Sequence, residues 1–394
     1  MNIGIFTDTY YPQVSGVATS IKVLREQLER QGHNVYLFTT TDPKVKKEVY
    51  ERNIFRFTSV PFISFTDRRV AIRGLLQAYR ISSKLQLDII HTQTEFSIGL
   101  MGKLVAKMLK IPCVHTYHTM YEDYLHYVAK GKVLRPKHVR LMTRSFCQNL
   151  SGVIAPSDRV LAKLQEYQVT TPVEVIPTGI DVSKFQQPEY LNYRAKYGLT
   201  ATTPVILTLS RVAYEKDIDR LITAMVEVKK RVTGAKLMIC GDGPARADLE
   251  AQAKLLGLKQ DVIFTGEIDN DSVAHYYHLA NVFVSASVSE SQGLTYLEAL
   301  AAGIPVVAAN NPYTNGLLNH PSLGATFETP AQLVSEIVTY LNNPPRVADQ
   351  AARSEKLAEI SAQNFGQKVS EFYKESQAYY LNERQMAKRS SEIG

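Results

Sequence analysis

Two glutamates eight residues apart mark the part of this sequence best suited to chemistry. Glu290 and Glu298 lie on either side of Gly293, which separates a short apolar stretch, 281–285, from a helix expected from about Leu294. Free N–H groups at a helix start favour an anionic group, and carboxylates accept hydrogen bonds from hydroxyls. Alone, such a spacing is more often two surface glutamates. The glycine turn and the Gly-Ile-Pro-Val-Val that follows favour a site for a ligand with an anionic part and hydroxyls, such as a nucleotide sugar.

A second group of charged residues follows another expected strand. Arg211 and Lys216 would supply preorganised positive charge where negative charge develops on a phosphate. Arginine can bind an oxyanion in bidentate fashion, and lysine acts as a point charge. In isolation such a pair is more often a solvated loop. Asp217 and Asp219 could be taken for metal ligands, but we expect Asp217 to cap the helix that begins at Ile218.

The stretch Glu290–Ala308 resembles the E-x7-E signature of the retaining glycosyltransferases of family 4, and the likeness extends over nearly the whole chain. Further segments are similar to the bacterial 1,2-diacylglycerol 3-alpha-glucosyltransferases of that family. These segments are Gly4–Pro12 with Gly16, Thr116–Tyr124 and Ser210–Lys216. The resemblance implies an α/β fold of the GT-B type. In that fold two Rossmann-like domains, each a doubly wound parallel sheet, face a central cleft, and a C-terminal helix crosses back to the first domain.

The resemblance also implies roles for individual residues. His118 would contact the donor sugar and orient the attacking hydroxyl, and Glu290 would stabilise a cationic sugar ring. Arg211 and Lys216 would hold the diphosphate, and Glu298 the ribose hydroxyls. The residues expected to bind the donor are Gly16, Gly241, Ile268, Gln292, Gly293, Leu294, Thr295 and Glu298. Gly16 is expected in a loop before a helix from about Ala18, where the backbone must approach a phosphate closely.

The activity that the resemblance implies is transfer of glucose from UDP-glucose to the 3-hydroxyl of 1,2-diacylglycerol. The product would be alpha-monoglucosyldiacylglycerol, a glycolipid and precursor of lipoteichoic acid anchors. UDP-glucose is then a substrate, and neither a prosthetic group nor a metal at the diphosphate is expected. A galactose donor, another lipid or soluble acceptor, and a nucleotide-sugar epimerase remain open. A non-catalytic membrane module is disfavoured by the combined presence of His118, Arg211, Lys216, Glu290 and Glu298.

Composition and charge narrow the class of protein. A chain of 394 residues can form two domains, and it has no run of about 18 apolar residues that would span a membrane. Residues 1–180 carry a net charge of +10 and residues 181–394 a net charge of −3. The basic half indicates an anionic partner, such as a membrane surface, and no nucleic-acid-binding motif is visible. The apolar start without a basic leader favours a cytoplasmic protein, and the three dispersed cysteines indicate reduced thiols.

Short apolar strands alternating with helices predict two parallel sheets in succession. We expect an acceptor and membrane domain over 1–178, a nucleotide-sugar domain over 179–366 and a helix over 367–394. Strands of the first sheet are expected at 2–7, 34–39, 54–57, 88–91, 113–117 and 152–155. Strands of the second sheet are expected at 205–210, 236–240, 262–265, 282–285 and 305–308.

Two basic amphipathic helices are predicted, over Arg69–Lys84 and Pro136–Leu150. Such helices either pack their apolar face on the core, which is the commoner case, or lie flat on anionic lipid. A lipid acceptor would favour the second. Their apolar residues are Ile72, Leu75, Leu76, Tyr79, Val139, Met142, Phe146 and Leu150. Their basic residues are Arg69, Arg73, Arg80, Lys84, Lys137, Arg140 and Arg144.

Overall fold

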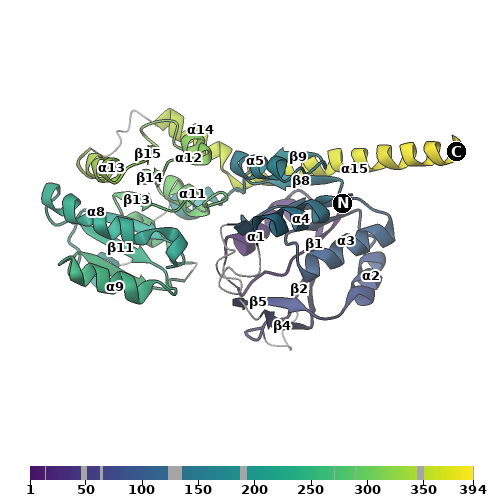
Figure 1. Ribbon diagram of the computed structural model, residues 1–394, viewed down its shortest axis with the longest axis horizontal. Helices are drawn as coiled ribbons and strands as arrows, with labels where there is room; N and C mark the ends of the chain where they lie inside the picture. The colour runs from purple at the N-terminus through teal and green to yellow at the C-terminus, as the bar shows by residue number, and fades with distance from the viewer. Residues whose placement is uncertain are drawn as a thin grey trace. The chain divides into compact units, whose positions relative to one another are not determined.

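The computed structural model divides the chain into two compact units (Figure 1). Met1–Gly179 together with Ala362–Gly394 form the first, and Ile180–Ser361 form the second. The residues described are 1–13, 15–45, 51–62, 65–122, 135–186, 193–269, 271–288, 290–343 and 350–393. Each unit contains one parallel sheet with helices on both faces, so the predicted pair of Rossmann-like units is confirmed.

The sheet of the first unit has seven strands in the order β3-β2-β1-β6-β7-β8-β9. They are β1 (Asn2–Phe6), β2 (Asn34–Thr40), β3 (Ile54–Phe57), β6 (Ile89–Thr92), β7 (Cys113–Thr116), β8 (Gly152–Ala155) and β9 (Val173–Val175). The chain runs outward from β1 to β3 and then returns to β6 on the other side of β1. In open sheets of this kind, ligands bind at the carboxyl ends of strands where the order reverses. That point lies between β1 and β6.

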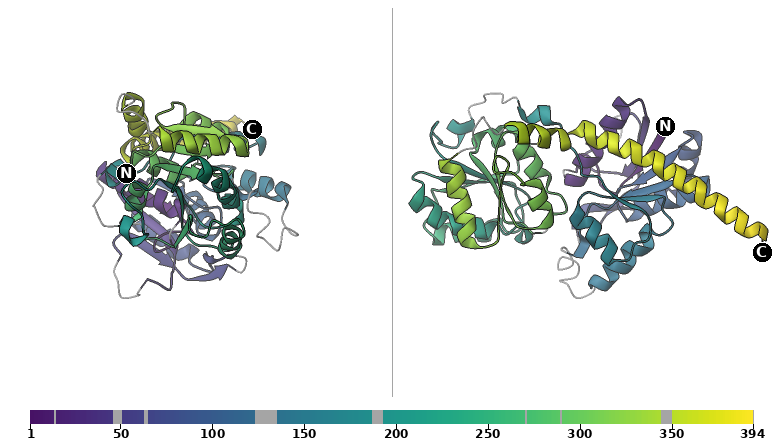
Figure 2. Two further views of the ribbon diagram at one scale, coloured as in Figure 1. Left: turned by 90° about the vertical axis from the view of Figure 1, so that its left-hand side faces the viewer. Right: turned by 90° about the horizontal axis from the view of Figure 1, so that it is seen from above.

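Helices cover both faces of this sheet. On one face α2 (Leu75–Lys84), α3 (Ser97–Leu109), α4 (Pro136–Cys147) and α5 (Asp158–Glu166) share one hydrophobic core. On the other face α1 (Gly16–Arg30) packs against α15 (Ala362–Ile393), which Figure 2 shows running across this unit. Gly102 lets α3 lie close to the sheet, because a Cβ there would come within 2.7 Å of the Phe6 ring.

The sheet of the second unit has six strands in the order β12-β11-β10-β13-β14-β15. They are β10 (Val205–Leu209), β11 (Lys236–Cys240), β12 (Val262–Gly266), β13 (Val282–Ser285), β14 (Val306–Ala309) and β15 (Gly324–Phe327). On one face lie α8 (Ile218–Arg231), α9 (Arg246–Leu255) and α13 (Pro330–Asn342). On the other lie α6 (Val182–Gln186), α7 (Tyr193–Lys196), α10 (Val273–Leu279), α11 (Leu294–Ala301), α12 (Pro312–Leu317) and α14 (Gln350–Glu359). Here the strand order reverses between β10 and β13.

The predicted basic helix over Arg69–Lys84 is wrong in its first third. Arg69 lies in β5 (Phe65–Ala71), which forms an antiparallel hairpin with β4 (Ser59–Phe62), and the helix begins only at Leu75. The Arg69 guanidinium donates hydrogen bonds to the Ser59 carbonyl at 2.7 Å and to the Ser59 hydroxyl at 2.9 Å. Gly74, with φ of +128°, separates strand from helix. Arg69 therefore holds the hairpin together and does not belong to a basic helix face.

Two predicted helix starts also need correction. Gly16 is not in a loop but is the first residue of α1, because the Ser15 hydroxyl caps the helix by accepting from the Ala18 N–H at 3.2 Å. Asp217 does precede α8, yet its side chain makes no capping hydrogen bond. Its backbone is left-handed, with φ of +49°, because it closes a short 3-10 turn, η3 (Tyr214–Lys216).

The three cysteines are buried, and none forms a disulfide, which confirms the prediction of buried free thiols. Burial raises the pKa of each of these thiols to about 12, so they are unreactive at neutral pH. Within the described ranges, none of the helices combines the length and apolar character that crossing a bilayer requires.

Candidate functional site

The second unit brings two predicted residues together at its strand reversal. Lys216 follows β10 and Glu290 follows β13, and these strands are neighbours in the sheet. The Lys216 ammonium donates to Glu290 Oε1 at 2.5 Å, with side chains only 12% and 23% exposed. A largely desolvated ion pair therefore lies where open parallel sheets bind their ligands.

The start of α11 lies directly after Glu290, as predicted. Gly293 takes the N-cap position with φ of +69°, and a Cβ on it would come within 2.7 Å of the Tyr296 ring. Gly293 itself has no side chain that could cap this helix start, and N–H groups at a helix start favour an anion. Gln292 is buried, Leu294 packs against the core, and the Thr295 carbonyl accepts from the Tyr277 hydroxyl at 3.1 Å.

Glu298 is a largely buried carboxyl on α11. The Tyr277 hydroxyl donates to its Oε2 at 2.8 Å. Burial raises the pKa of Glu298 to about 7, although the Tyr277 hydrogen bond and the charge of Lys184 act in the opposite direction. A carboxyl that titrates near neutral pH beside a helix start is typical of a binding or catalytic site.

The glycines after β11 hold the segment that carries Arg211. Gly241 has φ of +129°, and a Cβ on it would lie 1.9 Å from the Ser210 carbonyl oxygen. A Cβ on Gly243 would lie 2.3 Å from the Val212 carbonyl oxygen. These glycines therefore allow the loop to pack against the backbone on both sides of Arg211, whose side chain is exposed. Sequence reasoning assigned Gly241 to donor binding and missed this supporting contact.

Ile268 follows β12 and is half-buried, packing against the core of the second unit. It belongs to the short segment Gly266–Ile268. Gly266 has φ of +76° and forms a bridge with Gly241. This segment therefore ends at the same edge of the sheet as the Gly241 loop.

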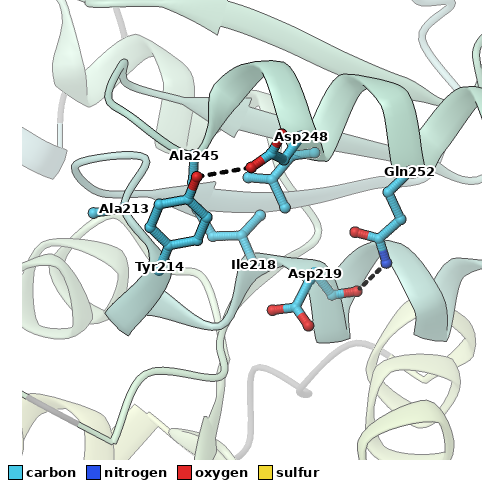
Figure 3. A pocket seen from close by; sticks show the side chains of 8 residues that line it. Ala213, Tyr214, Ile218, Asp219, Ala245, Asp248 and Gln252 are labelled. Carbon is cyan, nitrogen blue, oxygen red and sulfur yellow. Dashed lines mark hydrogen bonds between the residues drawn. The ribbon is translucent and has the colours of Figure 1, made fainter.

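A small pocket of about 250 Å³ lies near η3, between α8 and α9 (Figure 3). It is lined by Ala213, Tyr214, Ile218, Asp219, Ala245, Asp248, Leu249 and Gln252. The Tyr214 hydroxyl donates to Asp248 at 2.7 Å, and the Gln252 amide donates to the Asp219 carbonyl at 3.0 Å. The lining contains two carboxylates and no basic side chain, so this pocket is unsuited to a diphosphate.

In the first unit, His118 lies in the loop after β7 and contacts Gln93, just after β6. His118 Nε2 is 2.6 Å from Gln93 Oε1. An amide oxygen only accepts, so Nε2 carries the proton and Nδ1 keeps its lone pair. Burial lowers the pKa of His118 to about 3, so the imidazole is neutral. The arrangement leaves His118 able to accept a hydrogen bond through Nδ1.

Gln93 is a site residue that sequence reasoning missed. Its side chain is 2% exposed, and its amide nitrogen has no hydrogen-bond partner within the described part of the chain. A buried donor without a partner is costly, and each such group calls for an explanation. The available signal was its place directly after the strand that ends at Thr92, beside the strand reversal.

A buried carboxylate fixes the backbone next to Gln93. Asp8, directly after β1, accepts hydrogen bonds from the hydroxyls of Thr94 and Ser97 and from the Ile98 N–H at 3.0 Å. These bonds cap the start of α3 with an acidic side chain, which suits the positive end of a helix dipole. Asp8 therefore ties together the ends of β1 and β6.

Further hydrogen bonds anchor the loop that carries His118. Glu95 accepts from the Tyr121 hydroxyl and lies 3.2 Å from the buried ring of His115. On the other side, the His91 ring lies 2.7 Å from both the Tyr373 hydroxyl of α15 and the Thr116 hydroxyl. Hydrogen bonds thus hold the strand ends near His118, tying one of them to the terminal helix and Glu95 to the loop.

The predicted membrane residues other than Arg69 lie on or beside α2 and α4. Arg73 precedes α2, and Arg80 and Lys84 are exposed on it. On α4, the exposed basic residues are Lys137, Arg140 and Arg144. Of the apolar residues expected on these helices, Val139, Phe146 and Leu150 are buried, whereas Ile72, Leu76 and Met142 are exposed.

Across the ranges that the structure describes, no group of three or more His, Cys, Asp or Glu side chains is placed to hold a metal ion.

Models of two glycosyltransferase families match the chain. Residues 14–184 match Glycosyltransferase Family 4, and residues 190–357 match Glycosyl transferases group 1. The chain is 49% identical over 379 residues to the alpha-monoglucosyldiacylglycerol synthase of Streptococcus pneumoniae, covering 95% of this chain and 85% of that protein. It is 31% identical to the alpha-monoglucosyldiacylglycerol synthase of Acholeplasma laidlawii, covering 97% of both.

Solved structures with the same fold include sucrose-phosphate synthase from Thermosynechococcus elongatus, with a TM-score of 0.75 and 21% sequence identity. That match covers 95% of this chain and 98% of the other. The Anabaena protein HepE in complex with UDP also has a TM-score of 0.75, with 18% identity and coverage of 94% and 99%. These likenesses show the GT-B fold. Together with the sequence matches over both units, they show that the chain belongs to glycosyltransferase family 4.

Proposed function

We propose that the protein transfers glucose from UDP-glucose to the 3-hydroxyl of 1,2-diacylglycerol, with retention, to give alpha-monoglucosyldiacylglycerol. The observation that carries this proposal is the Lys216–Glu290 ion pair, which lies just before the start of α11 in the chain. It supplies charge for a diphosphate and a carboxylate for a sugar. The names of the pneumococcal and Acholeplasma relatives support the lipid product. Such a glycolipid would also serve as a precursor of lipoteichoic acid anchors.

The second unit is the proposed donor domain. Arg211, Lys216 and the N–H groups at the start of α11 would bind the diphosphate, and Glu298 would bind the ribose hydroxyls. The remaining proposed donor contacts of this unit are Gly241, Ile268, Gln292, Gly293, Leu294 and Thr295, and Gly16 of the first unit is also proposed to contact the donor. That HepE binds UDP supports a uridine nucleotide as the donor. In this scheme neither a prosthetic group nor a metal at the diphosphate is required.

The proposed reaction exchanges one bond at the sugar for another on the same face. The bond from the sugar C1 to the diphosphate oxygen breaks as the acceptor oxygen bonds to C1, and the acceptor proton passes to the leaving diphosphate. Lys216 and Arg211 stabilise the charge that builds on the diphosphate, and Glu290 stabilises the cationic sugar ring. Neutral His118 accepts a hydrogen bond through Nδ1 and orients the sugar and the acceptor hydroxyl.

Donor affinity is expected to depend on the protonation of Glu298. Only the ionised carboxylate can accept from two ribose hydroxyls, and its pKa of about 7 means that binding must release a proton below neutral pH. The affinity for UDP-glucose should therefore rise about tenfold between about pH 6 and pH 8. Calorimetry with UDP-glucose measures this, because its diphosphate does not titrate in that range. In Glu298→Gln the pH dependence should disappear.

The same group affects stability with the opposite sign. Its raised pKa means that, between the ordinary glutamate pKa of 4.5 and about 7, the folded protein retains a proton that the unfolded chain has lost. The free energy of unfolding without ligand should therefore fall as the pH rises through this window, and Glu298→Gln should reduce the fall. Donor affinity that is flat with pH in the wild type would contradict the assignment of Glu298 to the ribose hydroxyls, and stability that is flat with pH would contradict its raised pKa.

Gln93 is proposed as the positioning residue for His118. Gln93→Leu keeps the volume but leaves the buried Nε2–H of His118 without an acceptor, and we expect kcat to fall about tenfold. Gln93→Glu restores an acceptor and should recover activity. Its carboxylate would also raise the pKa of His118, so the pH profile of kcat should gain an acid limb.

A matched control for Gln93 is Gln165→Leu, an exposed position on α5 of the same unit, which should leave kcat unchanged. UDP binding should be equal in all three variants, because neither Gln93 nor Gln165 is among the proposed donor contacts. A loss of activity in Gln93→Glu as large as in Gln93→Leu, with no change in the pH profile, would show that Gln93 serves only packing.

The first unit is the proposed acceptor domain, lying peripherally on an anionic membrane surface at the cytoplasmic face. The exposed basic residues of α2 and α4 and the net charge of +10 over residues 1–180 support this. The residues proposed to face the lipid headgroups are Arg73, Arg80, Lys84, Lys137, Arg140 and Arg144. Arg69 is withdrawn from this set because it bonds to Ser59.

Mass spectrometry of the products tests the proposal. The protein is incubated with UDP-glucose and UDP-galactose together, with and without diacylglycerol vesicles. The expected product is a monoglucosyl lipid that forms only with vesicles, with the anomeric configuration retained. A galactosyl lipid would show that the donor is UDP-galactose. A soluble product formed without vesicles would show that the acceptor is not a lipid. A new UDP-sugar epimer formed without any acceptor would replace the proposal with an epimerase.

A further inference from the structure

The outer side of α3 is apolar, although it is a surface helix. Four large apolar side chains, each between 42% and 48% exposed, lie along it: Phe96, Leu100, Leu104 and Met108. They are spaced four residues apart, so they form one stripe on one side of the helix. The other side of α3 is buried in the core of the first unit. An ordinary surface helix has charged or polar residues on its outer face, so this stripe needs a partner.

The helices beside α3 also carry exposed apolar residues. Helices α2 and α3 lie side by side (Figure 1). The Lys103 ammonium of α3 donates to the carbonyls of Ser145 and Gln148, at the end of α4, at 3.2 and 2.8 Å. The exposed apolar residues on or beside α2 and α4 are Ile72, Leu76, Leu141 and Met142. We call these residues and the α3 stripe the docking surface. Helix α1, on the opposite face of the sheet, has no large hydrophobic residue that is similarly exposed.

The charge of these helices indicates the kind of partner. None of the residues of α2, α3 and α4 is Asp or Glu, whereas seven are Lys or Arg. By contrast, α1 and α5 carry charges of both signs. Apolar side chains flanked only by basic ones are typical of surfaces that enter anionic lipid. A second copy of this chain is disfavoured, because pairing this surface with itself would bring basic helices together.

The stripe begins beside the loop that carries His118. The ring of Phe96 packs edge-on against Tyr121, with centroids 5.7 Å apart, and Tyr121 donates to Glu95. Tyr121 is three residues after His118. From Phe96 the stripe runs about 18 Å along α3 to Met108, at 1.5 Å per residue. An acceptor lipid lying along the stripe would thus have its headgroup end near His118.

We propose that the docking surface inserts into the interface of an anionic bilayer, with the α3 stripe as its apolar centre and the basic residues of α2 and α4 at the headgroups. The inference deepens the proposed function and rests on it for the identity of the acceptor lipid. The apolar contact is assigned to α3, a helix that the charge pattern of the sequence does not single out. The basic residues of α2 and α4 supply the salt-sensitive part of the attraction.

Insertion can be observed directly, because the chain contains no tryptophan. In Leu104→Trp the new indole is the only one, and its emission should shift to the blue with vesicles of phosphatidylcholine and phosphatidylglycerol. Lipids brominated in their acyl chains should quench it. The control is Leu255→Trp, on α9 of the second unit, where the native side chain is 85% exposed. That emission should not change. If the Leu104→Trp protein binds vesicles but its emission neither shifts to the blue nor is quenched by brominated lipids, the proposal is overturned.

A partition experiment gives a second measure. The double change Leu100→Ser with Leu104→Ser should lower the vesicle partition coefficient by roughly 10- to 100-fold, since two apolar contacts with lipid are lost. Leu255→Ser with Leu256→Ser is the matched control and should leave it unchanged. Salt should weaken binding of all variants, because screening acts on the basic residues over about 10 Å at 0.1 M. UDP affinity and the melting temperature should match the wild type and show that the fold is intact.

The outcomes separate this inference from the proposed function. The vesicles contain neither diacylglycerol nor UDP-glucose, so insertion is measured whether or not a glucosyl lipid is ever formed. A partition coefficient that is unchanged by the α3 substitutions would overturn the docking surface while the transferase activity stands. The proposal would also be overturned if the wild type formed a concentration-dependent dimer in sedimentation and the α3 substitutions abolished that dimer without changing the vesicle partition coefficient. The surface would then be assigned to a second copy of the chain.

Discussion

Replacing Lys216 by Ala is expected to lower kcat/KM for UDP-glucose by about 30- to 1000-fold. A cation held against the departing diphosphate stabilises charge that exists mainly in the transition state. Loss of one such group costs roughly 2–4 kcal/mol, by analogy with the loss of one oxyanion-hole donor. In the structure Lys216 is 12% exposed and paired with Glu290, so water compensates little for its removal. Steady-state kinetics with saturating diacylglycerol vesicles measures the effect.

Arg211→Ala should reduce kcat/KM over the same range. A matched control is Lys229→Ala, which also removes a lysine of the second unit that pairs with a carboxylate, here Asp261. The Lys229 side chain is 48% exposed and lies in the last turn of α8, so this change should leave kcat/KM within about twofold of the wild type. Near-normal kcat/KM in both Lys216→Ala and Arg211→Ala would contradict the assignment of these two residues to the diphosphate.

The two sheets were predictable because parallel strands buried on both faces read as short apolar runs. The β4–β5 hairpin was not. Its second strand, Phe65–Ala71, contains basic residues, and the helical spacing of Ile72, Leu75, Leu76 and Tyr79 predicted a helix that begins at Arg69. Strand pairing between Val60 and Val70 decides the local structure, and such a long-range contact leaves no local periodicity.

The residues of the candidate site that belong to a sequence motif could be predicted. Those that depend on how the strands pack together could not. Glu290 and Glu298 share one motif, but the contact between Lys216 and Glu290 spans 74 residues. It depends on β10 and β13 being neighbours, and the alternation of strands and helices does not fix strand order. Gln93 escaped notice because an amide side chain has no motif of its own. Its importance comes from the adjacency of β6 and β7, which places it against His118.

The exposure of α3 could not be predicted either. Its sequence is apolar on nearly every side, which is typical of a helix buried between other elements. The sequence therefore directed attention to the more evidently amphipathic helices α2 and α4. Only the packing shows which apolar residues of α3 face the core and which face outward.

Glu290→Gln should lower kcat by about 100-fold while KM for UDP-glucose changes only a few-fold. The substitution preserves the shape of the side chain and removes the negative charge that would stabilise a cationic sugar ring, a charge that develops only in the transition state. An interaction made only there lowers kcat and kcat/KM together. Glu298→Gln is the matched comparison within the same motif. Its proposed ribose contact exists equally in the ground state, so it should chiefly raise KM.

The ion pair between Glu290 and Lys216 provides a stricter test of the same assignment. Groups in direct contact are not independent, so the double variant Glu290→Gln with Lys216→Ala should lose less activity than the product of the two single losses. The coupling should appear in kcat and not in UDP affinity, because Glu290 is assigned to the sugar and not to the nucleotide. If Glu290→Gln raised KM alone, with kcat intact, the carboxylate would only bind substrate. The stabilisation of the sugar cation would then have to come from the leaving diphosphate itself.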